Sequence, residues 1–274
     1  ITLAENNRLV VGASYRSAKA SNDGRNGSAK YNEKVNNKAL FISDQWEFAP
    51  SWTLNAGARY DDHSKAGDKT TLSAGLNKKF DENSHAYFNW GQVFKAPTLD
   101  DLFYDDGYMV GNPDVKPEKG DNWTVGYGTK LGDKTEVNVS YFQSNLKDAI
   151  DWVYKSDFSG MNPQNIQKQK KNGMELSINH HNDLWNADVF LRAGSGAATH
   201  VYQGKYGPEQ SYIDSSYLTL DASVSYKATK DLSFYAKGYN LFNKAYAESA
   251  GVSGASYKYP AQSRRFIIGA EYSF

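Results

Sequence analysis

The alternation of apolar and polar residues with a period of two constrains this chain more than any other feature. In Arg265 to Phe274, aromatic and aliphatic residues occupy the even positions and mostly small or polar residues the odd ones. The same pattern runs through residues 52–60, 123–128 and 218–226. Successive side chains of a β-strand point to opposite faces, so this period predicts strands with one apolar and one polar face. The fold class expected is all-β.

Two further observations favour a membrane wall over a soluble sandwich. The chain contains no run approaching the roughly 18 apolar residues that a membrane helix needs, so strands are the remaining way to cross a bilayer. Aromatic residues make up 14% of the chain and include 20 Tyr, which suits rings at two membrane interfaces. These features predict a transmembrane β-barrel in the outer membrane of a bacterium, in contact with its lipid.

Strand and turn signals divide the whole chain in a regular way. We expect an antiparallel barrel wall of about 12 strands at residues 8–18, 37–48, 52–61, 70–80, 85–95, 121–131, 135–146, 171–181, 185–196, 216–227, 231–242 and 264–274. Tight turns alternate with longer polar loops, expected at 19–36, 62–69, 96–120, 147–170, 197–215 and 243–263. Short turns on one side and long loops on the other are typical of outer-membrane barrels. Without a linker or composition shift, 1–274 is predicted to be a single barrel domain.

The last strand also carries an expected insertion signal. Apolar residues at alternate positions with an aromatic residue at the end mark a terminal strand that the barrel assembly machinery of the outer membrane would receive. The residues assigned to this signal are Phe266, Ile268, Tyr272 and Phe274.

Composition excludes several other functions. Lys plus Arg equals Asp plus Glu at 31 each, so no overall charge favours nucleic acid. The chain has no Cys, and its five His residues are dispersed, with His180 and His181 directed to opposite faces of one strand. No nucleophile with a neighbouring base and acid is evident. We therefore expect no enzyme activity, no metal site and no cofactor.

Four stretches resemble the TonB-dependent receptors, which import iron complexes, haem or cobalamin across the outer membrane. They are Phe94-Lys95-Ala96-Pro97, Gly111-Asn112-Pro113-Asp114-Val115-Lys116-Pro117-Glu118, Asn240 to Tyr246, and Arg265 to Phe274. In that family the first two stretches bracket an external loop. Proline ends a strand because it cannot donate to the ladder, so a structural role is expected for Pro97 and Pro113.

The resemblance covers only the later part of the family's barrel. Its members carry an N-terminal plug with an energy-coupling box, followed by 22 strands. Neither plug nor box is present in this sequence, which suggests either part of a receptor barrel or a shortened barrel closed on its own strands. The inner-membrane protein TonB is then a partner only if the full protein has a plug.

The loop between the first two stretches is the expected ligand site. It mixes aromatic residues with four aspartates, and rings of this kind stack on an aryl siderophore while polar neighbours orient it. The candidate residues are Phe103, Tyr104, Asp105, Asp106, Tyr108 and Met109. Haem is disfavoured because the ligating His that the family's haem receptors carry here is missing, although Tyr104 or Tyr108 offers an oxygen ligand.

The function expected is therefore uptake of an iron–siderophore complex. Cobalamin and haem remain alternative ligands. A passive diffusion pore formed by a shortened barrel is a further alternative, with Arg59, Lys237 and Glu271 as inward-facing charges. A structural or adhesive protein whose loops bind another surface is also compatible with the sequence.

Overall fold

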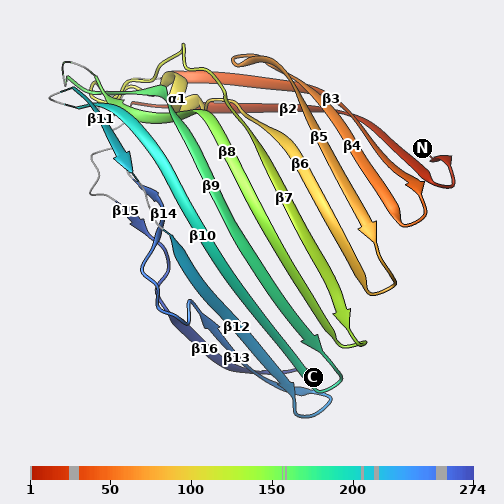
Figure 1. Cartoon of the computed structure of the whole chain (residues 1–274). Coiled ribbons are helices and arrows are strands. Elements are labelled where there is room, and N and C mark those ends of the chain that lie inside the picture. Colours follow the sequence, from red (N-terminus) through yellow and green to blue (C-terminus); the bar gives the residue numbers. More distant parts are fainter. Residues whose placement is uncertain are drawn as a thin grey trace.

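The chain folds into one long antiparallel sheet (Figure 1). The computed structural model describes residues 2–24, 31–155, 157, 159–204, 207–212, 216–250 and 258–274. Its strands are β1 (Thr2–Ala4), β2 (Asn7–Asn22), β3 (Tyr31–Ala49), β4 (Trp52–His63), β5 (Gly67–Lys79), β6 (Ser84–Lys95), β7 (Glu118–Leu131), β8 (Thr135–Tyr154), β9 (Met161–His181), β10 (Trp185–Gly204), β11 (Gly207–Tyr212), β12 (Tyr217–Lys227), β13 (Leu232–Tyr239), β14 (Ala247–Ala250), β15 (Lys258–Pro260) and β16 (Arg265–Tyr272).

The order of strands in the main sheet follows the sequence. It runs β1-β2-β3-β4-β5-β6-β7-β8-β9-β10-β12-β13-β16, with β11 paired to β10 outside this path, while β14 and β15 form a separate pair. A short helix, α1 (Leu99–Phe103), lies in the connection between β6 and β7. Within the described residues, no helix is both long and apolar enough to cross a membrane.

The register of the sheet keeps the two faces chemically distinct. Leu54 pairs with Trp46 on one side and Leu76 on the other, whereas the next residue, Asn55, pairs with Gln45 and Gly75. This confirms the alternation read from residues 52–60. The polar face lines hollows of the curved sheet, and many large apolar side chains stand exposed on the other face.

The position of the buried residues separates this sheet from a soluble sandwich. A sandwich buries its apolar face in a core. Here the large apolar residues of the outer face, such as Leu40, Ile42 and Leu72, remain exposed. Among the residues whose burial the structure describes, five apolar residues are buried, and four of them, Leu102, Val115, Ala149 and Val153, lie instead around α1 and the tip of the β8–β9 hairpin. The sheet therefore needs an apolar surrounding, as a lipid-facing wall does.

The last strand has the expected orientation. Phe266, Ile268 and Tyr272 lie on one face of β16 and are 63%, 84% and 62% exposed, and Phe274 follows the strand fully exposed. Glu271 pairs with Ser233 on the opposite face. The apolar residues of the expected insertion signal thus share one outward face, while their recognition by the assembly machinery stays a prediction.

Each of the twelve expected strands is present, and several are longer than the sequence pattern suggested. The short turns gather at one end of the sheet and α1 lies at the other (Figure 1). We call these the turn end and the α1 end. At the turn end, Gly132 adopts a φ of 67° between β7 and β8, a conformation that glycine adopts without strain.

The expected long loops at the α1 end require correction. β8 continues to Tyr154 and β9 already begins at Met161, so most of 147–170 is strand rather than loop. Segments 19–36 and 197–215 likewise contain the ends of β2, β3 and β10 together with β11, and 243–263 contains β14 and β15. The ladder continues through these polar segments because its hydrogen bonds join backbone groups and do not depend on an apolar side-chain pattern.

The expectation of a barrel closed on its own twelve strands is not met. In the described part of the chain, β16 pairs only with β13, and β2 pairs with β3 and the short β1. Unpaired backbone groups are costly in lipid, so two free edges agree with the other expectation, a portion of a larger barrel.

Candidate functional site

The connection between β6 and β7, residues 96–117, begins with a helix that the sequence analysis did not anticipate. Pro97 ends the strand, and Thr98 caps α1: its hydroxyl accepts from the Asp101 amide at 3.1 Å while an Asp101 carboxylate oxygen accepts from the Thr98 amide at 2.9 Å. This reciprocal capping box satisfies two amides that a helix start leaves open. The sequence Thr-Leu-Asp-Asp after proline is the signal that predicts it.

A tight acidic turn follows α1. Asp105 accepts from the Gly107 amide at 2.8 Å, and one oxygen of Asp106 accepts from the amides of Tyr108 and Met109 at 2.9 and 2.6 Å. The Met109 and Tyr108 amides hold the pKa of Asp106 below its ordinary value. Both aspartate side chains therefore stabilise the turn by accepting hydrogen bonds from backbone amides within it.

The tip of the β8–β9 hairpin holds this turn in place. The Met161 amide donates to the Tyr108 carbonyl at 2.7 Å, and the Val110 amide donates to the Met161 carbonyl at 2.9 Å. A Cβ at Gly160 would stand 2.2 Å from the Tyr108 carbonyl oxygen, so only glycine permits this close approach. The turn behaves as a short extra strand on the hairpin.

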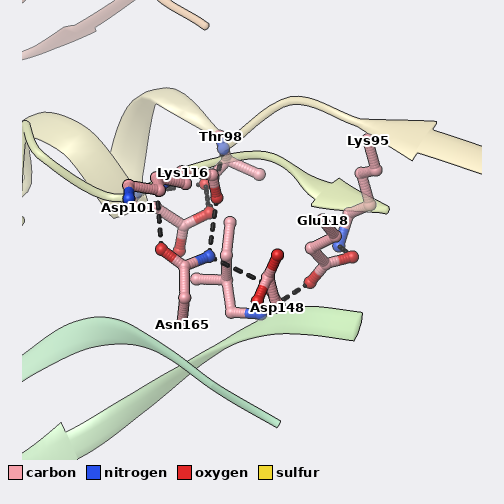
Figure 2. Close-up of polar contacts among 8 residues, drawn as sticks. Lys95, Thr98, Asp101, Lys116, Glu118, Asp148 and Asn165 are labelled. Carbon is pink, nitrogen blue, oxygen red and sulfur yellow. Dashed lines mark hydrogen bonds and ion pairs between the residues drawn. The ribbon is translucent and has the colours of Figure 1, made fainter. Parts of the chain in front are cut away.

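Asn165 joins the second half of the connection to β9 and β8 (Figure 2). Its Oδ1 accepts from the Lys116 amide at 2.7 Å, and its Nδ2 donates to the carbonyls of Lys116 and Asp148 at 2.7 and 2.8 Å. Nearby, Asn112 Nδ2 donates to the Pro163 carbonyl at 3.1 Å. Two asparagines thus supply hydrogen bonds where prolines interrupt the strand ladder.

A buried carboxylate completes this attachment (Figure 2). Glu118 is 5% exposed; one of its oxygens lies 3.1 Å from Lys95 Nζ and the other accepts from the Ile150 amide at 2.9 Å. Beside it, Lys119 Nζ lies 2.7 Å from a carboxylate oxygen of Asp148. A buried charge is tolerated because both of its oxygens have partners. The motif residues Lys95, Asn112 and Glu118 therefore fasten the connection to the sheet.

Aromatic side chains surround the acidic residues of α1. The Tyr31 hydroxyl of β3 donates to Asp100, and this hydrogen bond raises the Tyr31 pKa to about 12. Trp152 Nε1 donates to Asp101 at 3.2 Å, and the Trp152 ring meets Tyr104 edge-on at 6.3 Å. Tyr31 and Tyr104 line a hollow of about 740 Å³ together with Asp100.

A second cavity, of about 870 Å³, lies between the inner faces of β2–β5 and the beginning of the connection. Arg16, Lys19, Arg59 and Lys95 line it, against Asp61 and Asp100. Arg59 Nε and Nη2 donate to Asp61 at 2.8 and 2.9 Å, which forms a bidentate pair. Arg16 has no acidic partner within the described residues, so the cavity carries an excess of positive charge.

The structure distributes the expected ligand residues unevenly. Of the six, Tyr104 alone lines a described cavity. Asp105, Asp106, Tyr108 and Met109 form the turn, and the ring of Phe103 lies 4.8 Å from Lys65 Nζ. The motif residues Phe94, Lys95, Ala96 and Pro97 line the larger cavity. As ligand contacts, all of these residues remain predictions.

The sequence did not predict which residues of strands distant from the connection line the two cavities. Arg16 lies on the polar face of the first expected strand, so its inward direction was readable, but its closeness to Pro97 depends on the curvature of the sheet. Tyr31 falls in a segment expected to be loop. Lys237 and Glu271 lie on β13 and β16, away from Arg59 on β4. In the described part of the chain, no cluster of His, Cys, Asp and Glu is arranged to hold a metal ion.

Comparison with known proteins agrees with these features. The family described as "TonB dependent receptor-like, beta-barrel" matches residues 1–205. The chain is 27% identical over 297 residues to the vitamin B12 transporter BtuB of Vibrio vulnificus, covering 97% of the chain and 47% of that protein. It is 24% identical over 165 residues to a hemin receptor of Yersinia pestis, covering 50% of the chain and 24% of the receptor.

Solved structures show the same fold. The siderophore receptor PirA of Pseudomonas aeruginosa superposes with a TM-score of 0.65 at 20% identity, covering 98% of this chain and 53% of the receptor. A mutant of the ferric enterobactin receptor PfeA from the same organism gives a TM-score of 0.64 at 18% identity, covering 100% and 52%. The chain spans about half the length of the vitamin B12 transporters and of the solved receptors that it matches.

The family match covers more than half of the chain, and the fold agrees with it throughout. Proteins of this family are transporters, not enzymes, and they reside in the bacterial outer membrane. The chain belongs to the TonB-dependent receptors, of whose transmembrane β-barrel it forms a part.

Proposed function

We propose that the protein imports an iron–siderophore complex and that the cavity beneath α1 is its capture site. The observation that carries this proposal is the excess positive charge of a cavity of about 870 Å³ at the α1 end. Ferric complexes of oxygen-donor siderophores are commonly anions. Arg16, which has no acidic partner among the residues that the structure describes, attracts them beside the Arg59–Asp61 pair. Phe94 adds an aromatic surface for an aryl group.

The fastening of the connection supports the same proposal. A capture site loses less affinity to loop ordering when its walls are already held in place. Asn165, Glu118 and the Met161 backbone hold residues 96–117 against β8 and β9 without any ligand. The cavity then lies between the held connection, residues 96–117, and the charged inner faces of strands β2–β4. For import, the proposal further includes a plug and its coupling to TonB in the whole protein.

Cobalamin is the second candidate. It is favoured by the relatives named vitamin B12 transporters, which align with 97% and 90% of this chain. Cobalamin carries no strong negative charge, so positive charge in the cavity contributes little to its capture. Haem is a weaker alternative, because residues 96–117 contain no His and the hemin receptor aligns with only 50% of the chain.

Equilibrium binding to the purified receptor distinguishes these ligands. The receptor is titrated with a ferric catecholate siderophore, cyanocobalamin and haem, in wild-type form and as Arg16→Glu. Lys134→Glu at the turn end makes the same charge change far from the cavity and serves as the matched control. We expect siderophore binding to weaken about tenfold in Arg16→Glu and to fall with added salt. Saturable cobalamin binding with no siderophore binding would replace this proposal with the second candidate.

A further inference from the structure

The outer face of β7, β8 and β9 changes its chemistry stepwise toward the α1 end. Val139 and Leu176 pair directly and begin an apolar zone. Two residues further along β8, Tyr141 meets Trp123 of β7 at a ring distance of 5.3 Å. The next positions on this face carry amides, Gln143 and then Asn145. Apolar, aromatic and polar zones in this order mark the boundary between hydrocarbon and headgroups.

The hydroxyl of Tyr141 gives this boundary its direction. Asn172 Nδ2 of β9 donates to it at 3.2 Å, and Asn172 pairs with Gln143, two residues closer to the α1 end than Tyr141. The phenol therefore points its polar atom toward the α1 end and its ring toward the apolar zone. Tyrosines at a membrane interface adopt this arrangement because one end of the side chain is apolar and the other is wet.

Beyond the amides the same face carries a row of lysines. Lys119 of β7 pairs with Lys147 of β8, and Lys147 pairs with Lys168 of β9. Lys170 lies two residues from Lys168 on the same face of β9. Like charges directly opposite one another destabilise a sheet, so this row calls for negative charge from elsewhere.

The protein supplies only part of that charge. Asp148 pairs with Lys119 at 2.7 Å, and Asp121 accepts from Asn145 at 3.1 Å. The remaining lysines are exposed and have no acidic partner within the described residues. We call these three residues, which are Lys147, Lys168 and Lys170, the lysine cluster. The β10 residues that pair with Lys168 and Lys170 are Thr199 and Ala197, both uncharged.

Lys170 lies just above the depth of lipid headgroups. It pairs with Asn145, four residues beyond Tyr141, which is about 13 Å along a strand and about 10 Å along the membrane normal at a usual tilt. Lys147 and Lys168 pair with each other six residues beyond Tyr141, about 20 Å along a strand and about 15 Å along the normal. The headgroup layer on each side of a bilayer is about 5–8 Å thick. Flexible lysine stems bend back toward an interface, so the three ammonium groups approach this layer from its outer side.

We propose that the lysine cluster binds the phosphate groups of an outer-leaflet lipid. Phosphate oxygens accept short, charge-assisted hydrogen bonds from ammonium groups, and several lysines side by side give a site for more than one phosphate. The acyl chains of the same lipid would lie along the aromatic and apolar zones below. Neither the cavity nor the fastening of residues 96–117 includes these three side chains, so this lipid site is independent of the ligand that the receptor imports.

Lipid retention by the intact receptor tests the proposal. The receptor in detergent is titrated with bisphosphorylated lipid A and with dephosphorylated lipid A, and bound lipid is counted by native mass spectrometry. The test variant carries Lys147→Gln, Lys168→Gln and Lys170→Gln. The matched control carries Lys79→Gln, Lys130→Gln and Lys134→Gln, three exposed lysines at the turn end. A third variant replaces the lysine cluster by Arg and keeps its charge.

We expect the wild type, the control and the Arg variant to retain the phosphorylated lipid. The Gln variant should bind it about a hundredfold more weakly, at roughly fivefold per lysine. Equal retention by the Gln variant and the wild type would overturn the proposal, as would equal retention of dephosphorylated lipid A or displacement by inorganic phosphate at lipid concentrations. If the Gln variant does not fold, loss of binding in Lys168→Gln alone, compared with Lys168→Arg, decides the question.

Discussion

Replacing Asn165 by Ala should release residues 96–117 from the β8–β9 hairpin. The substitution removes three hydrogen bonds, two with the Lys116 backbone and one with the Asp148 carbonyl. Each such bond contributes about 0.5–1.5 kcal/mol net. The freed groups are partly exposed, so water replaces some of this bonding and a cost of about 2 kcal/mol is expected. This corresponds to about a thirtyfold rise in the population of the detached connection.

Hydrogen exchange of backbone amides in the detergent-solubilised receptor measures this population directly. Peptides covering 96–117 should exchange about thirtyfold faster in Asn165→Ala. Asn165→Asp keeps the acceptor for the Lys116 amide but places an oxygen that cannot donate against the carbonyls of Lys116 and Asp148, so exchange should be at least as fast in that variant. Asn55→Ala is the matched control, since Asn55 makes no side-chain hydrogen bond within the described residues. Unchanged exchange of 96–117 in Asn165→Ala, or an equal change in the control, would mean that Asn165 does not hold the connection against the hairpin.

Three further perturbations probe the same end of the sheet. Glu118→Ala removes the partner of Lys95 and of the Ile150 amide and should speed proteolysis of the connection by roughly tenfold. Glu118→Gln should have a milder effect because it keeps an acceptor for the Ile150 amide. Equal effects of the two substitutions would contradict this. Gly160→Ala forces a backbone shift and should lower the unfolding temperature, whereas Gly91→Ala, which meets only an ordinary contact of 3.8 Å, should cost less. The Tyr31 contact with α1 should persist below pH 10 and weaken as pH rises through about 12, because the pKa of Tyr31 in the folded protein exceeds the ordinary value of 10.0. Titration of phenolate absorbance checks this: the step of highest pKa should be present in the wild type and absent from Tyr31→Phe.

The barrel wall was predictable because lipid imposes a pattern on every spanning strand. Alternation in residues 52–60 and 265–274 identified both the strands and their outward faces, and the structure confirms both. The family resemblance is confirmed by the family match, which includes Phe94 to Pro97 and Gly111 to Glu118. The other two stretches of the resemblance, Asn240 to Tyr246 and Arg265 to Phe274, lie beyond the matched residues 1–205.

The α1 end was less predictable for a physical reason. Beyond the membrane both faces of a strand are polar, so alternation no longer distinguishes strand from loop, and the extension of β8 and β9 was missed. The capping box of α1 is encoded locally, by Thr98 and Asp101, but residues 96–120 were expected to be loop and the helix was missed. The contacts of Asn165 with Lys116 and of Tyr31 with Asp100 join residues far apart in the chain, and only the folded sheet brings them together.

In a barrel wall of this kind, the face carrying Leu54, Ala56 and Ala58 contacts lipid, while Asn55 and Gly57 face an aqueous interior. Because the chain contains no Cys, single cysteines introduced along 53–59 report each position separately. In outer membranes, a water-soluble thiol reagent should label the odd positions quickly and the even positions slowly, and a lipid-soluble quencher should affect probes at the even positions only. Labelling that does not alternate, or that alternates in the opposite phase, would show that these strands do not form a lipid-facing wall in this orientation.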